Sequence, residues 1–208
     1  MSDPCRGSAG FFGKLPSRGD FVSNGLATMA VGVWDRAVAS VLTAARVRLA
    51  ERFASVWLVA PVWRFALPAG MCGPEPLLGL WMPSVDKVGR YFPLMIAGTC
   101  PGAAPACMAR CGGAWLDAAE MAGRSALADD LAPDRLAALI PACPDLAAGP
   151  ATGLPYGLVP RPGAALWWTE GSPLVPAQGL VLDGMPEPDR FLCMLDASLC
   201  PGMADPAP

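Results

Sequence analysis

Residues 62–97 read VWRFALPAGMCGPEPLLGLWMPSVDKVGRYFPLMIA, and the expected fold class rests mainly on this stretch. It contains three short apolar runs, Val62–Leu67, Leu77–Met82 and Tyr91–Ala97, each bounded by proline or glycine, a pattern typical of strands and turns. The link between the second and third runs, Pro83–Arg90, is rich in turn-forming residues. The stretch therefore predicts three strands, the last two joined as a β-hairpin.

Helical and strand patterns alternate on both sides of this stretch. Apolar residues recur at spacings of three and four over about 28–54, which predicts a helix with Thr28 as its N-cap. A second helix, weakened by Gly112 and Gly113, is expected over 105–128. The remaining predictions are strands over 10–16 and 164–170, helices over 133–140 and 187–195, and irregular chain over 172–178.

A hairpin combined with long helices favours an α/β (α+β) fold with a largely antiparallel central sheet flanked by helices. We expect a single domain over residues 1–208, because no boundary within the chain is convincing. Its ordered core should span about 10–198, with a long loop at 141–162 and a frayed tail at 201–208.

Composition restricts the class of protein. Hydrophobic residues make up 53% of the 208 residues and charged residues 16%, so a sizeable core can form. The formal net charge is -3 and the basic residues are scattered, so no basic stripe for nucleic acid is present. Neither a signal peptide nor an apolar run of membrane-spanning length is recognisable, and we expect a soluble, cytoplasmic protein.

The chain has eight cysteines and no histidine. In a protein without an export signal, cysteines are more often free thiols than disulfides. Cys107 and Cys111 are four residues apart, a spacing that is a poor match to zinc sites, and we expect no metal and no cofactor. Without histidine, Ser-His-Asp and Cys-His nucleophile systems are impossible, so we expect that the protein is not an enzyme.

Three further motifs stand in order along the chain: GFFGKLPSRGDF at residues 10–21, PVWRFAL at 61–67 followed by MPSVDKVGRYFPL at 82–94, and LWWTEGS at 166–172. Together they resemble the TagF (ImpM) family of proteins associated with bacterial type VI secretion systems. The resemblance implies a cytosolic accessory protein that restrains the secretion apparatus after translation. It further implies action by contact with a cytoplasmic forkhead-associated scaffold protein. The family supplies no agreed catalytic residues, so none can be transferred.

Eight residues of these segments are candidates for partner binding, because loops on rigid strands often carry function. They are Lys14, Arg18, Asp20, Ser84, Asp86, Arg90, Trp168 and Glu170.

Several of these candidates also have a structural interpretation. Asp86 can cap backbone N–H groups of its own link and pair with Arg90. Trp168 follows another tryptophan on a predicted strand, so the two face opposite sides of the sheet. One of them can be core, and the other must be covered by a helix or exposed to a partner. Glu170 could pair with Arg18 or Arg90.

Two alternatives to a binding regulator stay open. The first is an enzyme or a domain that binds a small anionic ligand through the basic side chains of the loops. Gly13 and Lys14 resemble the end of a P-loop, but Ser8 and Leu15 stand where that motif requires glycine and Ser or Thr. The second alternative is a structural subunit of the secretion apparatus.

Overall fold

The structure, a computed structural model, describes residues 7–144, 146 and 151–200. Its centre is one seven-stranded sheet in the order β2-β1-β5-β4-β3-β6-β7, and every neighbouring pair of strands is antiparallel. The largely antiparallel sheet predicted from the sequence is therefore confirmed. The strands are β1 Ala9–Gly13, β2 Val22–Asn24, β3 Trp63–Leu67, β4 Leu77–Met82, β5 Leu94–Thr99, β6 Ala165–Thr169 and β7 Gln178–Leu182.

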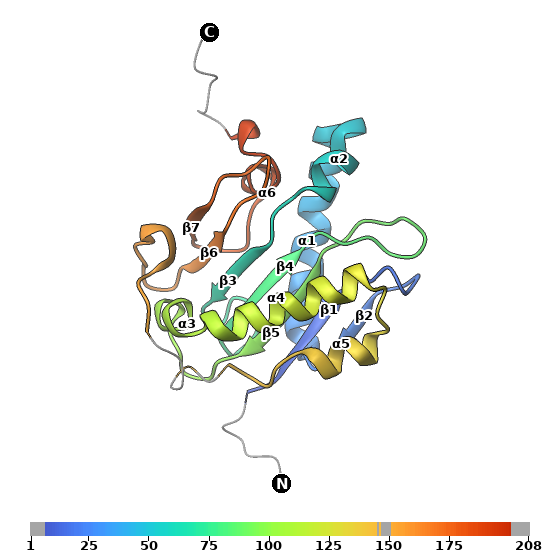
Figure 1. Ribbon diagram of the computed structural model, residues 1–208. Helices are drawn as coiled ribbons and strands as arrows, with labels where there is room; N and C mark the ends of the chain where they lie inside the picture. The colour runs from blue at the N-terminus through green and yellow to red at the C-terminus, as the bar shows by residue number, and fades with distance from the viewer. Residues whose placement is uncertain (1–6, 145, 147–150, 201–208) are drawn as a thin grey trace.

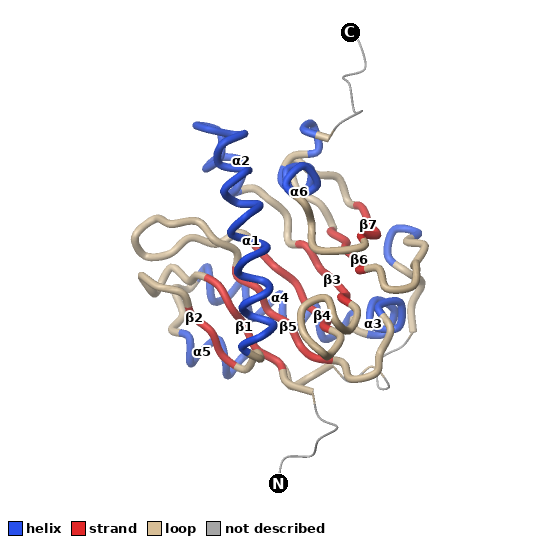
Figure 2. The backbone as a smooth tube through the Cα atoms, turned by 180° about the vertical axis from the view of Figure 1, so that it is seen from behind, coloured by secondary structure: helices blue, strands red, loops and turns tan. Residues whose placement is uncertain are grey.

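Helices cover both faces of the sheet, as Figures 1 and 2 show from opposite sides. On one face lie α1 (Thr28–Leu49), α2 (Phe53–Leu58) and α6 (Pro188–Leu195). On the other lie α3 (Pro105–Cys111), α4 (Gly113–Ala128) and α5 (Pro133–Leu139). Every residue of β4 is buried, because both of its faces are covered. This explains why its sequence is a continuous apolar run rather than an alternating one.

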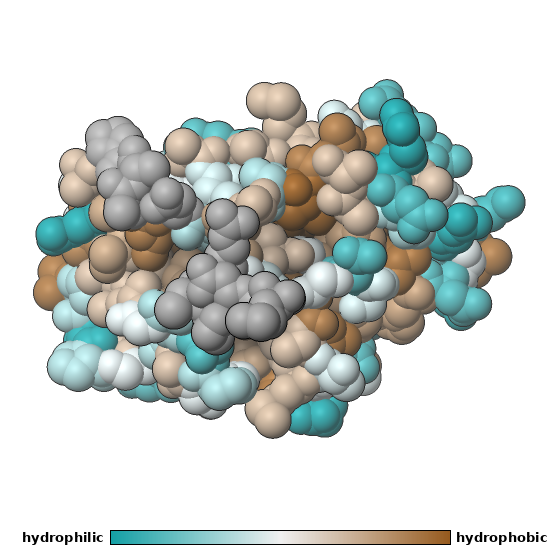
Figure 3. Space-filling view, turned by 90° about the horizontal axis from the view of Figure 1, so that it is seen from below, coloured by the Kyte–Doolittle hydropathy of each residue, from teal (hydrophilic) through white to brown (hydrophobic). Residues whose placement is uncertain are grey.

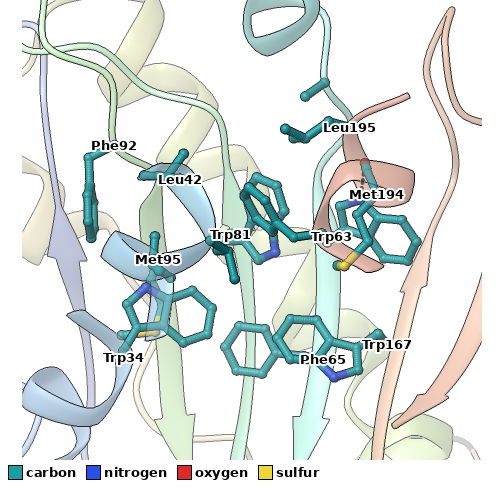
Figure 4. Packing of buried hydrophobic residues seen from close by; sticks show 14 of the residues in the cluster. Trp34, Leu42, Trp63, Phe65, Trp81, Phe92, Met95, Trp167, Met194 and Leu195 are labelled. Atoms are coloured by element: carbon teal, nitrogen blue, oxygen red, sulfur yellow. Dashed lines mark hydrogen bonds between the residues drawn. The ribbon is translucent and has the colours of Figure 1, made fainter. Parts of the chain in front are cut away.

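Large aromatic side chains fill the layer between the sheet and α1 (Figure 4). The Trp34 ring from α1 lies 5.2 Å from the Phe65 ring of β3 and 6.3 Å from the Trp167 ring of β6, measured between centroids. Trp168, the next residue, points to the opposite face and packs in the layer under α3 and α4. The prediction that the two tryptophans face opposite sides is confirmed, and both are buried.

Two tryptophans of this layer allow a matched test of one hydrogen bond. The Trp63 indole N–H donates to the Met194 carbonyl at 2.9 Å, whereas the buried Trp34 N–H has no acceptor among the described residues. The variant Trp63→Phe leaves the buried Met194 carbonyl without its donor. We therefore expect Trp63→Phe to lower the free energy of unfolding by about 1–2 kcal/mol more than Trp34→Phe does. Urea denaturation of both variants measures the difference. Equal losses would show that the indole bond contributes nothing.

The helix predictions need three corrections. The helix predicted over 28–54 ends at Leu49, and a short 3-10 turn separates it from α2. Its N-cap is Ala27 without a side-chain cap, not Thr28. The helix predicted over 105–128 is divided at Gly112 into α3 and α4. A Cβ at Gly112 would lie 2.2 Å from the Leu78 side chain, so the close approach of this turn to β4 requires glycine.

Two strands were missed by the sequence analysis. β2 covers Val22–Asn24, for which no element was predicted, and β7 begins at Gln178, the last residue of the segment interpreted as irregular. Both are edge strands of the sheet, and β7 is only partly buried along its length. Such strands carry a weak hydrophobic pattern and form because a neighbouring strand offers its backbone. The strand predicted over Tyr91–Ala97 is β5, and it starts later than predicted, at Leu94, after Pro93.

Candidate functional site

The loops of all three family-like segments lie at one end of the sheet. The antiparallel register places the end of β1 beside the start of β5, and the end of β4 beside the starts of β3 and β5. The end of β6 reaches the same side, because Trp168 pairs with Arg64 near the start of β3. This end of the sheet therefore gathers segments that are far apart in sequence.

Two of these loops lie side by side in both backbone views (Figures 1 and 2): the turn 14–21 after β1 and the link 83–93 between β4 and β5. Their backbones are joined directly, since the Lys87 N–H donates to the Arg18 carbonyl at 2.9 Å. We call the two segments together the paired loops.

A buried ion pair sits between the paired loops. The Lys14 ammonium donates to the Asp86 carboxylate, and the two residues are only 4% and 3% exposed. Asp86 also accepts from the Val88 N–H at 3.0 Å, the Arg90 N–H at 2.8 Å and the Arg90 Nε at 2.7 Å. The predicted structural role of Asp86 is thus what the geometry shows: it caps its own link and pairs with Arg90.

The surroundings of Asp86 stabilise its ionised form. Burial by itself raises the pKa of the Asp86 carboxyl. The hydrogen bonds from Lys14, Arg90 and the Val88 N–H outweigh that effect and hold the pKa well below its usual range. The carboxylate therefore keeps its charge, and the link keeps its shape, at any physiological pH.

Ser84 ties the paired loops to the rest of the molecule. Its hydroxyl donates to the Lys14 carbonyl at 2.7 Å, and its own carbonyl accepts from the Trp57 indole of α2 at 3.0 Å. Ser84 is buried, so its hydroxyl is not free to contact a partner. Three of the eight candidates, Lys14, Ser84 and Asp86, therefore support the surface from beneath rather than form it.

Phe21 was not singled out by the sequence analysis, but it belongs to this site. Its ring stacks on Phe12 at 5.4 Å and meets the edge of Phe92 at 4.8 Å between centroids. The Lys14 ammonium lies 4.9 Å from the centre of the same ring. Phe21 is nonetheless 49% exposed. A large aromatic residue in a Gly-Asp turn was the signal that could have indicated it.

Three candidates do lie on the surface of the paired loops: Arg18, Asp20 and Arg90. The Arg90 guanidinium donates to the Gly19 carbonyl and lies 3.6 Å from the Asp20 carboxylate. The Asp20 side chain is 98% exposed, so this outer pair is worth little energy. The exposed charged residues therefore lie above the buried side chains of Lys14, Ser84 and Asp86, which are held by hydrogen bonds.

The last two candidates lie elsewhere. The Trp168 side chain is 3% exposed, so the suggestion that it meets a partner is wrong; α3 and α4 cover it. Glu170 is exposed but accepts from the Tyr156 hydroxyl at 2.6 Å, instead of pairing with Arg18 or Arg90. Three strands, β5, β4 and β3, separate β6 from β1 in the sheet, which puts Glu170 away from the turn 14–21.

A second charged cluster holds α4 on the sheet. The Arg64 guanidinium of β3 lies 2.9 Å from the Glu120 carboxylate and 2.7 Å from that of Asp117. The Glu120 side chain is only 17% exposed, so its carboxylate belongs to the packing between α4 and β3. Because Arg64 is neutralised twice, it is not available for an anionic ligand.

The thiols of the described chain are mostly inert in their surroundings. Burial raises the pKa of Cys72 to about 11 and of Cys100 and Cys193 to about 12, so these thiols stay protonated. Cys107 is exposed and lies four residues from Cys111 on α3. Across the described part of the chain, no three Cys, Asp or Glu side chains gather in a way that could hold a metal ion.

Comparison with known proteins identifies the family. Residues 10–143 match the sequence model of the TagF N-terminal domain, described as type VI secretion system-associated. The chain belongs to the TagF family. The match includes both paired loops and their buried ion pair, so the TagF assignment and the candidate site rest on the same residues.

A solved structure extends the likeness of this TagF-family chain over nearly its whole length. The crystal structure of PA0076 from Pseudomonas aeruginosa PAO1 superposes with a TM-score of 0.74 at 30% sequence identity. The match covers 96% of this chain and 98% of the other, so β6, β7 and α6, which follow the region matched to the family, are also shared. A comparison with curated proteins gives no match. No helix within the described residues has the length and apolarity to cross a membrane.

Proposed function

We propose that this TagF-family protein is a cytoplasmic negative regulator of a type VI secretion system that acts by binding another protein. The observation that carries the proposal is the pair of loops locked by Lys14 and Asp86. A buried, fully bonded support beneath an exposed charged surface is preorganised for contact with a partner, because little conformational entropy remains to be lost on binding.

The chemistry of the same loops argues against the enzyme alternative. The Lys14 ammonium, which a phosphate-binding loop would need, is engaged by Asp86 and buried. The buried Asp86 carboxylate and Ser84 hydroxyl of these loops are likewise engaged, the first by Lys14 and Arg90 and the second by the Lys14 carbonyl. Such a surface suits recognition rather than bond making.

The partner we propose is the cytoplasmic forkhead-associated scaffold protein of the same secretion system. Deletion of the gene should raise type VI secretion, measured as the amount of a secreted apparatus protein in the culture medium. The purified chain should co-precipitate the scaffold from the native cytosol, identified by mass spectrometry.

A matched pair of variants tests whether the paired loops are needed in this experiment. Asp86→Ala should lose both scaffold recovery and repression, whereas Asp134→Ala on the exposed start of α5 should complement the deletion fully. Unchanged secretion in the deletion strain, with no recovered type VI component, would contradict the proposal. Recovery of the chain in purified assemblies at fixed stoichiometry would favour a structural subunit instead.

A further inference from the structure

The paired loops are basic on a protein that is acidic as a whole. Residues 14–21 and 83–93 contain four basic and two acidic residues, a net charge of +2 on a chain of net charge -3. Asp86 pairs with Lys14 and Arg90, and Asp20 lies near Arg90, so Arg18 and Lys87 are the exposed charges of these loops that no carboxylate among the described residues pairs with. The local sign of the surface is therefore opposite to that of the molecule.

Helix α1 extends this basic surface along the base of the link. The Arg46 guanidinium lies over two rings, 4.8 Å from the centre of Phe53 and 5.5 Å from that of Tyr91. It also donates to the Tyr91 carbonyl at 3.4 Å. No carboxylate among the described residues pairs with Arg46, so its charge adds to those of the loops. We call Arg18, Arg46, Lys87 and Arg90 the basic rim.

The paired loops also carry two exposed apolar side chains. Phe21 is 49% exposed and Val88, at the tip of the link, is 67% exposed. Phe21 is held by Phe12 and Phe92, so it presents a fixed aromatic face. Figure 3 shows the molecule from below, with hydrophilic side chains gathered along the side on which Figure 1 places the paired loops. Rigid aromatic anchors inside a charged border are typical of protein–protein contact.

Acidic residues lie next to the paired loops near Ser17. The Ser17 hydroxyl donates to the Leu131 carbonyl at 2.7 Å, beside the exposed Asp129 and Asp130 after α4. The rim therefore has an acidic border, which restricts the orientation in which a charged partner can approach.

We infer that the partner of this TagF-family protein docks on the basic rim through an acidic protein surface that carries an apolar pocket or patch for Phe21 and Val88. The inference rests on the proposed function and names the chemistry of its partner. A protein surface fits better than a nucleic acid, because Asp20 stands 98% exposed beside Arg90 and would repel a continuous polyanion. The same Asp20 can meet one basic residue of a folded partner.

Binding of the purified full chain to the purified scaffold protein tests the inference. The double variant Arg18→Glu/Lys87→Glu should raise the dissociation constant about 10- to 100-fold, because it replaces attraction by like-charge repulsion. Raising the salt from low to high concentration should weaken the wild-type complex and leave the variant little changed. Both side chains are exposed and form no ion pair among the described residues, so folding should be unaffected, which thermal denaturation checks.

A matched control keeps the total charge change equal. Arg110→Glu/Arg190→Glu reverses two exposed arginines on α3 and α6 and should leave the dissociation constant within about twofold of wild type. α3 packs against β3 and β6, and α6 follows β7, at the edge of the sheet opposite β2 and β1. Equal weakening by the control pair would overturn the inference, because it would report net charge alone. A short DNA duplex that binds as tightly as the scaffold would also overturn it, in favour of a polyanion site.

Failure of the inference and failure of the proposed function give different results. If the scaffold binds wild type and the rim variant with equal affinity and no salt dependence, the basic rim is not the contact, while a binding regulator remains supported. If the scaffold does not bind wild type at all, the proposed function is wrong, and the inference is wrong with it.

Discussion

Replacement of Asp86 by alanine is expected to lower the free energy of unfolding by about 3–5 kcal/mol, because it leaves a buried charge without its partner. Lys14 is 4% exposed and has no other acidic neighbour within ion-pair distance among the described residues. The Val88 and Arg90 N–H groups lose their acceptor at the same time. Urea denaturation followed by circular dichroism measures the loss.

Two further variants isolate the cause. Asp20→Ala removes a carboxylate that is 98% exposed and should change stability by less than about 0.5 kcal/mol. Adding Lys14→Met to Asp86→Ala removes the stranded ammonium, so it should restore about 1–2 kcal/mol. If the two changes instead destabilise additively, the Lys14–Asp86 pair does not hold the loops together.

The Asp86 carboxylate should also make the stability of the protein depend on pH. Because the folded pKa of Asp86 lies below its unfolded value, its contribution is fully present above about pH 4, the ordinary range of an aspartic acid. It is lost as the pH falls from there toward the folded pKa. The difference in stability between wild type and Asp86→Ala should therefore shrink on acidification, and a constant difference would contradict the assignment.

Substitution of Gly13 by alanine should be the other large effect, about 3 kcal/mol or more, because strain and overlap add. Gly13 has φ +146°, and a Cβ there would lie 2.1 Å from the Pro93 carbonyl oxygen. β1 would have to move away from β5 immediately before Lys14, which would also displace the ammonium from Asp86. Scaffold binding should weaken together with stability.

Gly89 provides the control for the conformational part of this effect. It also has a positive φ, +85°, but a Cβ there meets no atom within 4 Å. Gly89→Ala should therefore cost only the backbone strain, about 1 kcal/mol. If both alanine variants lose the same stability, the close approach of β1 to Pro93 is not what requires Gly13.

The central strands were predictable because their environment is simple. β3, β4 and β5 are covered on both faces, and burial on both faces requires the apolar runs that the sequence displays. The role of Asp86 within its link was also predictable, since Asp86 and Arg90 are four residues apart and the geometry of such a link is local. The edge strand β7 was not, because its backbone partner comes from β6 rather than from its own pattern.

The candidate site was predictable as segments but not as an arrangement. Sequence alone singled out Lys14, Arg18, Asp86 and Arg90, yet it could not show that Lys14 lies beneath the surface and Arg18 upon it. Lys14 and Asp86 are 72 residues apart, and only the antiparallel register of β1 and β5 brings them together. Trp168 was misplaced for the same reason: whether α3 and α4 cover that face of β6 is a property of the packed molecule.

Residue type and local spacing were enough to predict the central strands and to exclude histidine chemistry, and three segments in order were enough for the family resemblance. Which charges are buried and which form the basic rim became visible only in the folded molecule. Charge burial depends on what packs above a side chain, and those atoms come from strands and helices distant in the chain.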